Sequence, residues 1–326
     1  MASPNASYGD ILATTIESRS KTIADNVTKN NALLARLKKR GKIKTVSGGH
    51  KIIQELSYAE NGNAGWYSGY ENLPIGAQDV ISGAQYNIKQ AACAVTVSGL
   101  EQLQNSGREQ IIDLLESRVS VAESTMANLI AAGIYADGTG FGGKEIDGLK
   151  QQVPTDPTTG TSGSVDRGSW TFWRSRKFKA TTDGGAATTS ANIIGYMNQL
   201  WASLVRGVDH PDLIVMDNAY WNMYVSALQA LQRFASSESA EAGFVTLKYM
   251  NADVVLDGGI GGFMATKEMY MLNTKYMFYR PHKSRNMVPL TPGTRYSVNQ
   301  DAAVQLMAWA GNLTSSGLQF QGKMFE

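Results

Sequence analysis

Cysteine, histidine and charge are all scarce in this chain. Cys93 is the only cysteine among 326 residues, which excludes an intramolecular disulfide and a cysteine-based metal cluster. The three histidines, His50, His210 and His282, fall in separate segments without metal-ligand spacing, so a zinc site has no support. Charged residues make up 18% of the chain, below the usual value of about 25%. The neutral surface that this leaves favours extensive contacts between proteins.

Two further absences bear on the partners of the protein. Thirty basic and 28 acidic residues leave a formal charge of +2, without the basic excess that a dedicated nucleic-acid binder usually shows. No apolar stretch approaches the roughly 20 residues needed to cross a bilayer. The first residues, MASPNASYGD, lack a charged leader followed by an apolar run. We therefore expect no membrane association and a protein that folds in a cytoplasm.

Motifs for catalysis are also lacking. The sequence contains no G-x-S-x-G, no phosphate-binding loop and no H-E-x-x-H. Ser18-Arg-Ser-Lys21 matches the S-x-x-K pattern of some acyl-transfer enzymes, but the companion motifs are missing. Gly138-x-Gly140-x-x-Gly143 is formally the dinucleotide fingerprint, yet it follows a predicted helix instead of a strand. We expect these glycines to end the helix and turn the chain, and we expect neither a cofactor nor an enzyme.

The longest regular pattern runs from Gly107 to Tyr135. This segment contains no proline, and its apolar residues recur at steps of three and four, which places one continuous stripe on one side of an α-helix. About 28 residues at 1.5 Å each make a rod of roughly 42 Å, long against a typical helix of about 11–12 residues. We predict a helical backbone for the other parts. Its stripe consists of Ile111, Leu115, Val119, Ala122, Met126, Leu129, Ile130 and Ile134.

A shorter helix is predicted from Ile23 to Lys39, with Gly41 as a good C-cap. Its last turns carry a run of cations. One interpretation makes this run an interaction patch for DNA or an acidic neighbour. The other, which we favour, makes the cations complements of the negative end of the helix dipole in solvent. The run consists of Arg36, Lys38, Lys39 and Arg40.

A long hairpin with an aromatic tip is predicted next. Residues 42–58 look like two strands joined by Ser47-Gly48-Gly49, and another extended run covers residues 85–97. Between them lies ENGNAGWYSGYENLPIG, residues 60–76, which is rich in glycine and asparagine. Large aromatic side chains on a protruding loop favour coverage by another chain. The alternative is a loop that folds back onto its own body. The aromatic side chains are Trp66, Tyr67 and Tyr70.

The second half of the chain mixes helices and strands. A helix capped by Ser190 is followed by the strand DLIVM, and we expect Asp217 and Asn218 to cap the next helix instead of serving in catalysis. WTFWRSRKFK, residues 170–179, interleaves aromatic and basic residues, which fits single-stranded nucleic acid or a strand with one face at an interface. More strands follow, with a final pair around residues 315–317. Antiparallel strands and helices without a regular βαβ rhythm indicate the α+β class.

Several short motifs follow one another in a distinctive order. VSGLEQL at residues 97–103 opens the long helix, ADGTG at 136–140 follows it, and IDGL comes at 146–149. NALLARLKKRG, GNAGWYSGYE and MYMLNTKYMFYRPHKSRNM through NQDAAVQ frame them. In this order the sequence resembles the major capsid proteins of tailed double-stranded DNA bacteriophages, which have the Hong Kong 97 (Johnson) fold. The resemblance covers nearly the whole chain.

The resemblance implies four parts. An N-terminal arm would cover residues 1–48 and an extended β-hairpin loop residues 49–100. A peripheral domain with the spine helix would cover 101–190, completed by 266–326, and an axial domain would cover 191–265. Hexamers and pentamers would form around the axial domains of an icosahedral capsid. Arms and loops would overlap neighbouring subunits, and the shell would expand after DNA packaging.

The resemblance also implies partners. The chain would assemble with itself, in the host cytoplasm and then in the virion, and would enclose double-stranded DNA without sequence-specific binding. Too little chain precedes the hairpin for a fused scaffolding segment, so we expect a separate scaffolding protein, together with a portal and a decoration or cement protein. Trp66, Tyr67 and Tyr70, with the basic run, are the expected contacts between subunits.

Three other functions stay open. An encapsulin-like compartment has the same fold but encloses protein cargo, so the contents of the particle would distinguish it. A soluble two-domain enzyme with an unrecognised site would form a small discrete oligomer with a pocket of convergent polar groups. A nucleic-acid binder that uses residues 170–179 would show salt-sensitive affinity for DNA.

Overall fold

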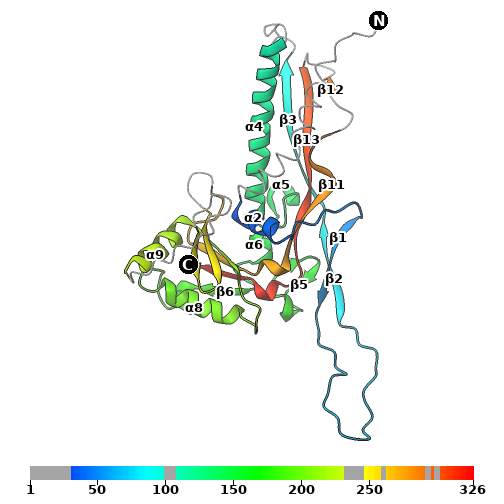
Figure 1. The fold of residues 1–326 in the computed structure, drawn as a ribbon, viewed down its shortest axis with the longest axis vertical. Coiled ribbons are helices and arrows are strands. Elements are labelled where there is room, and N and C mark those ends of the chain that lie inside the picture. The colour runs from blue at the N-terminus through cyan, green and yellow to red at the C-terminus, as the bar shows by residue number, and fades with distance from the viewer. Residues whose placement is uncertain (1–30, 99–107, 231–245, 258–261, 291–294, 297–301) are drawn as a thin grey trace.

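The protein has three visible parts. The computed structural model describes residues 31–98, 108–230, 246–257, 262–290, 295–296 and 302–326. Figure 1 shows an upright part in which α4 lies beside β3 and β13, a compact part that holds α8 and α9, and a hairpin of β1 and β2 that projects away from both. Among the described residues, no helix has the length and apolar character that a membrane span needs.

The N-terminal helix α2 (Ala32–Lys39) is shorter than predicted. Asn31 has an extended backbone, and its Oδ1 accepts hydrogen bonds from the backbone N–H groups of Leu33 at 3.0 Å and Leu34 at 3.1 Å. These bonds satisfy two donors that a helix start leaves without partners. The helix predicted from Ile23 is therefore confirmed only from residue 32 onward, and residues 23–30 lie outside the described part.

The predicted hairpin is present but divides differently. β1 (Lys51–Ser57) pairs antiparallel with β2 (Ile81–Asn87). β3 (Lys89–Ser98) follows after one residue and leaves this pair to join a different sheet. The expected single run over 85–97 is thus two strands. The expected strand over 42–46 forms only two isolated bridges, Ile43 to Tyr279 and Val46 to His282.

The long helix α4 (Arg108–Tyr135) confirms the prediction almost to the residue. Its stripe faces a sheet in which β13 (Ala302–Ser315) pairs with β3, β11 (Met277–Pro289) and β12 (Arg295–Tyr296). Where side chains are described, the stripe is buried except for half-buried Leu129, because it packs in one cluster with core residues of the sheet. The buried stripe residues are Val119, Ala122, Met126, Ile130 and Ile134. The motif at its entry, residues 99–107, lies outside the described part.

Glycines turn the chain after α4, as the sequence indicates. Gly138, Gly142 and Gly143 all have positive φ, a conformation that side chains with a Cβ rarely adopt. Within the described segment from 108 to 143, the element before the G-x-G-x-x-G motif is the helix α4 and not the strand that a dinucleotide site needs. The short elements after the motif are α5 (Gly140–Gly143), α6 (Leu149–Gln152), β4 (Thr161–Ser162), β5 (Val165–Asp166), η1 (Thr171–Trp173), β6 (Arg176–Lys179) and α7 (Ala180–Asp183).

A six-stranded sheet forms the centre of the compact part, in the order β6-β14-β10-β7-β9-β8. Two of its pairings, β14 with β6 and β7 with β9, are parallel, whereas the sequence indicated antiparallel strands mixed with helices. Its remaining elements are α8 (Ile193–Leu204), β7 (Leu213–Met216), α9 (Asn218–Ala230), β8 (Thr246–Tyr249), β9 (Ala252–Leu256), β10 (Glu268–Leu272), η3 (Thr274–Tyr276), η4 (Leu318–Phe320) and β14 (Gly322–Phe325).

Two more local expectations are corrected. The final strands β13 and β14 do not pair with each other, because the turn around residues 315–317 carries the chain from one sheet to the other. Ser190 does not cap α8. That helix begins after Asn192, whose Oδ1 instead accepts a hydrogen bond from the N–H of Thr189.

The six-stranded sheet separates two hydrophobic cores. On β7, Leu213 and Val215 pack in the core with α4, whereas Ile214 and Met216 pack in the core with α8 and α9. β10 alternates in the same way. Because successive side chains of a strand point to opposite faces, a strand covered on both faces needs apolar residues at every position. This arrangement of helices and mixed sheets confirms the α+β class.

Gly148 gives a test of this packing. A Cβ there would overlap the carbonyl oxygens of Gly133, Ile134 and Ala136 at the end of α4. We expect Gly148→Ala to destabilise the chain by about 1–3 kcal/mol, because backbone atoms must move. The control is Gly195→Ala in α8, where a Cβ meets no atom within 4 Å and should stabilise by up to about 1 kcal/mol. Urea unfolding measures both, and equal stabilities would contradict the close contact.

Candidate assembly interface

The loop between β1 and β2, residues 58–80, is almost wholly exposed. Two hydrogen bonds join its two sides: Tyr58 N donates to Val80 O at 3.1 Å, and farther out Asn63 Nδ2 donates to Gly76 O at 2.5 Å. Its other hydrogen bonds are local turns. Trp66 and Tyr70 are fully exposed and Tyr67 is 65% exposed. The loop does not fold back onto its own body, so that alternative is wrong.

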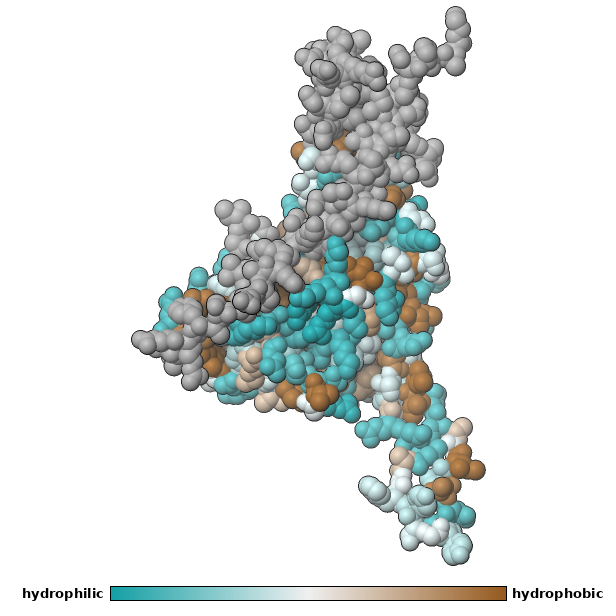
Figure 2. Space-filling model, in the orientation of Figure 1, coloured by the Kyte–Doolittle hydropathy of each residue, from teal (hydrophilic) through white to brown (hydrophobic). Residues whose placement is uncertain are grey.

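More apolar side chains than the sequence analysis considered lie on this hairpin. Ile75 is 92% exposed, and Leu73, Ile53 and Ile81 are each more than half exposed. Figure 2 shows hydrophobic patches along the projecting hairpin. Isolated exposed apolar residues need no explanation, but a contiguous group marks a binding surface. The signal for Leu73 and Ile75 was the pair of large apolar residues around Pro74 in a glycine-rich loop.

The base of the hairpin, in contrast, is firmly anchored. Its buried residues form a third hydrophobic cluster with Trp173 and Leu318. The Tyr86 hydroxyl donates to Ser315 O and accepts from Ser315 N, both at 3.3 Å. Burial raises the pKa of Tyr86 to about 12, so this hydroxyl keeps its proton at neutral pH. A rigid base and a barely supported tip give a loop whose apolar side chains are held away from the body.

Charge on the loop has a single sign. Glu60, Glu71 and Asp79 are its only ionisable residues apart from tyrosines, and no lysine or arginine occurs between residues 58 and 80. Glu71 folds back locally, where its Oε2 accepts a hydrogen bond from Ser68 N at 3.0 Å. The loop therefore presents aromatic rings on an acidic background, which suits a partner surface that is apolar with a basic rim.

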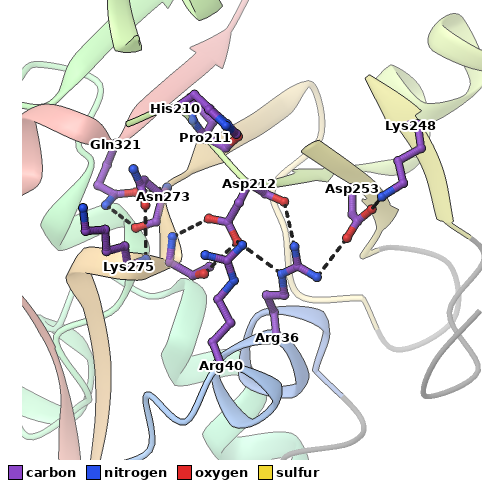
Figure 3. Close-up of polar contacts among 11 residues, drawn as sticks. Arg36, Arg40, His210, Pro211, Asp212, Lys248, Asp253, Asn273, Lys275 and Gln321 are labelled. Atoms are coloured by element: carbon purple, nitrogen blue, oxygen red, sulfur yellow. Dashed lines mark hydrogen bonds and ion pairs between the residues drawn. The ribbon is translucent and has the colours of Figure 1, made fainter. Parts of the chain in front are cut away.

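The basic run on α2 meets acidic residues of its own chain (Figure 3). Arg36 Nε lies 3.2 Å from Asp212 Oδ2, and Arg36 Nη1 lies 2.9 Å from Asp253 Oδ2. Arg40 Nη2 also reaches Asp212 Oδ2, at 3.2 Å. Both carboxylates are buried, and such charges are stable only when paired and hydrogen-bonded. This cluster joins α2 to the six-stranded sheet.

Other side chains and backbone groups also contact the carboxylates of Asp212 and Asp253. Thr274 donates to Asp212 through its N–H at 2.6 Å and its hydroxyl at 2.7 Å. Lys248 pairs with Asp253 on the side away from Arg36. Sequence reasoning missed both aspartates. The available signal was that each begins a buried strand, in DLIVM and in DVVLD, where an acid needs a cation from elsewhere in the fold.

The basic run had two interpretations, an interaction patch for DNA or an acidic neighbour and a complement to the helix dipole in solvent. They apply to different residues. Arg36 is largely buried against an acidic neighbour within the chain, whereas Lys38 and Lys39 are exposed at the C-terminal end of the helix. A contact between subunits through Arg36, Lys38, Lys39 and Arg40 stays a prediction.

The aromatic residues of WTFWRSRKFK pack within the chain. Trp173 is buried, and its Nε1 donates to Ser162 O at 2.9 Å. Trp170 lies against Tyr58 and Phe172, with ring centroids 5.5 and 5.8 Å apart. Only β6 is a strand, and the first half forms the 3-10 helix η1. Stacking on nucleic-acid bases would be open to Trp170 but not to Trp173.

Other residues singled out in the sequence have structural partners. Asp217 caps α9 by accepting from the N–H groups of Ala219 and Tyr220 at 3.0 Å, which confirms the predicted role, while Asn218 is the first helical residue. His210 stacks on Trp201. Within the described part of the chain, no three His, Cys, Asp or Glu residues come together as a possible metal site. Ser18 and Lys21 lie outside that part.

A matched pair of variants tests the ion-pair cluster. We expect Arg36→Met to destabilise the chain by about 2–3 kcal/mol, because two buried carboxylates lose a partner. The control, Lys39→Met, removes an exposed cation from the same helix turn and should cost about 0.5 kcal/mol through the helix dipole. Chemical unfolding of the unassembled chain measures both. Equal losses would mean that the dipole accounts for the whole basic run.

Comparison with known proteins gives structural but no sequence matches. No family model matches the chain, and no curated protein matches it in sequence. The capsid asymmetric unit of cyanophage A-1(L) is similar in structure, with a TM-score of 0.65, 16% identity, and coverage of 87% of this chain and 90% of that one. The capsid of an empty GTA particle gives a TM-score of 0.56 and 13% identity over 88% of each chain.

An encapsulin is also similar. The SrpI encapsulin of Synechococcus elongatus gives a TM-score of 0.51 and 8% identity, covering 89% of this chain and 86% of that one. At such identities the likeness is one of fold, spread over most of both chains. The resemblance seen in the sequence is thus confirmed at that level: the chain has the Hong Kong 97 (Johnson) fold of the capsid proteins of tailed bacteriophages.

Proposed function

We propose that this protein is the structural subunit of an icosahedral viral capsid, which self-assembles into hexamers and pentamers and encloses double-stranded DNA. The observation that carries the proposal is the projecting hairpin with its exposed aromatic tip. Three large aromatic rings that stay in water contribute no favourable free energy to a solitary chain. Their apolar surface contributes only when a partner covers it. Its tip projects away from its own body, so another molecule must cover it, and in the proposed shell of identical subunits that molecule is another copy.

The parts of the subunit follow from the same proposal. The arm would be residues 1–48, the extended loop 49–100, the peripheral domain 101–190 with 266–326, and the axial domain 191–265. Three strands of the six-stranded sheet, β6, β10 and β14, come from the segments assigned to the peripheral domain. The two domains would therefore move as one body, with the loop as the separately adjustable part.

The partners follow too. We infer a structural role without catalysis, a place in the virion shell after assembly in the host cytoplasm, and a separate scaffolding protein. A portal and a decoration or cement protein would complete the particle. The DNA would be enclosed without recognition of its sequence.

A second candidate is an encapsulin-like compartment. It is favoured by the similarity in fold to the SrpI encapsulin. The two functions differ in what the particle contains: nuclease-protected DNA for a viral capsid, a folded protein for a compartment.

The aromatic tip provides the test. We expect Trp66→Ser/Tyr67→Ser/Tyr70→Ser to leave a soluble subunit that assembles poorly, because the variant loses the apolar area that a neighbour would cover. The matched control, Trp66→Phe/Tyr67→Phe/Tyr70→Phe, keeps three rings and should assemble. Negative-stain microscopy of each protein, expressed alone and with its flanking genes, scores closed shells and rings of five or six subunits.

The outcomes are distinct. Normal and equally stable particles from the serine variant would remove the loop from the assembly mechanism. Small uniform particles from the unmodified protein in both preparations would overturn the capsid proposal itself. Shells that form only with the flanking genes would support it and show that a scaffold is required.

A further inference from the structure

Basic residues are concentrated in two segments that are far apart in sequence. Residues 36–51 contain seven lysines and arginines, and residues 275–285 contain four, with no aspartate or glutamate in either segment. The rest of the chain has 19 basic residues against 28 acidic ones. The near-neutral total charge therefore conceals a strong asymmetry, which the sequence analysis did not detect because it counted the chain as a whole.

The fold places these two segments side by side. The chain after α2 runs parallel to β11, with bridges from Ile43 to Tyr279 and from Val46 to His282. Backbone hydrogen bonds hold it there: Lys44 N donates to Tyr279 O at 3.0 Å, and Lys283 N donates to Val46 O at 2.8 Å. Cations from both segments are thereby brought onto one surface.

The alternation of side chains decides which face they occupy. Tyr279 is buried in the core with α4, so its neighbours Phe278 and Arg280 point to the opposite face of the sheet. Three cations lie over the ring of Phe278: Lys42 Nζ at 5.0 Å, Lys44 Nζ at 5.1 Å and Arg280 Cζ at 5.3 Å from its centroid. Cation–π attraction holds them together despite their mutual repulsion.

More exposed cations lie farther along β11, where the register with β13 shifts between Pro281 and Asn286. Lys283 and Arg285 are exposed on β11, and Arg285 Nη1 donates to Gln90 Oε1 at 3.1 Å. The exposed Lys275 begins the same segment and pairs with Asp209. We call this set the basic surface: Lys42, Lys44, Lys275, Arg280, Lys283 and Arg285. It adjoins the basic run of α2, and Figure 2 shows a broad hydrophilic area over the position of α2.

Nearby acids leave the basic surface positive. Asp212 and Asp253 lie against Arg36 and, for Asp212, Arg40. The pKa of Lys42 is lowered by its burial and by the positive charges of Lys44, Arg40 and Lys275. Cations at such spacing repel one another and destabilise the isolated chain. A dense anionic partner would remove that repulsion.

We propose that the basic surface binds the phosphate backbone of double-stranded DNA. Phe278, the ring beneath its cations, is buried, and none of the large apolar side chains exposed in the described part of the chain lies on either segment. An acidic protein partner would be expected to find apolar groups at the centre of its contact. Flexible lysines without an apolar centre instead fit a uniform array of phosphates, which they contact without reading sequence.

This inference goes beyond the proposed function, because affinity for DNA is measured on the unassembled chain and does not depend on shell formation. It also differs from the hypothesis that WTFWRSRKFK contacts nucleic acid. β6, which belongs to that segment, carries the exposed cations Arg176, Lys177 and Lys179. These three provide a control with the same number of charges at another site.

The experiment compares two triple variants of the full chain. Fluorescence anisotropy measures binding to a labelled duplex of about 20 base pairs and mixed sequence, between about 50 and 200 mM NaCl. We expect Lys44→Gln/Lys283→Gln/Arg285→Gln to raise the Kd roughly tenfold at the middle of this range. The slope of log affinity against log salt should fall by about 2.7, three lost phosphate contacts at about 0.9 each.

The control variant, Arg176→Gln/Lys177→Gln/Lys179→Gln, should bind DNA like the unmodified protein. Thermal melting establishes that both variants are folded. If both variants lose the same affinity for DNA, the loss reflects only net charge. If the control variant alone loses affinity, the DNA contact lies at β6. Either result overturns the proposal. So would tighter binding of poly-glutamate than of the duplex, because the partner would then be an acidic protein segment.

Discussion

The packing of the six-stranded sheet between two hydrophobic cores is the constraint on which the rest of the structure depends. β7 and β10 contribute alternate side chains to the core with α4 and to the core with α8 and α9. Neither core is complete without these strands, so the long helix and the compact part are joined by shared buried area instead of by a linker. α2 is added at the edge of this unit, where Arg36 neutralises the carboxylates of Asp212 and Asp253 at the starts of two central strands. An ion pair here sets the position of α2 more than it adds stability, because the desolvation of three charges offsets much of their attraction.

The base of the hairpin is held by that unit, whereas no residue in the described part of the chain covers the aromatic side chains of its tip. Tyr86 and Trp173 anchor the strands of the hairpin in a third cluster, and the loop beyond them leaves its apolar side chains in water. Such an arrangement is unfavourable for a single chain and favourable for a shell, in which each copy covers the loop of another. The capsid proposal thus rests on the contrast between a rigid base and an uncovered tip, together with a fold shared with phage capsid proteins at sequence identities of 8–16%.

Like the two hydrophobic cores, the charged clusters bring together residues that are far apart in the sequence. Arg36 and Arg40 pair with acids of the sheet, and cations of residues 275–285 and of the segment beside β11 form the basic surface. Phe278 is buried beneath that surface, where its ring attracts Lys42, Lys44 and Arg280 and so holds like charges together. With the acidic loop at the far end of the hairpin, the subunit has two faces of opposite sign. A shell built from such subunits would direct the two faces toward different partners.

Local pattern by itself determined much of this protein. The stripe from Val119 to Ile134 specified α4, the run LIVM specified a strand, and the glycines after residue 136 specified a turn. Each of these signals depends only on the periodicity and backbone freedom of neighbouring residues. The aromatic loop was also visible as a glycine-rich segment with large rings. Tertiary structure alone decided that β13 and β14 belong to different sheets, that Asp212 and Asp253 receive Arg36, and that residues 42–46 lie beside β11. These contacts join residues that lie between 18 and 236 positions apart in the chain. The partner is chosen by the shape and charge of the assembled cores and leaves no signature in the neighbouring sequence.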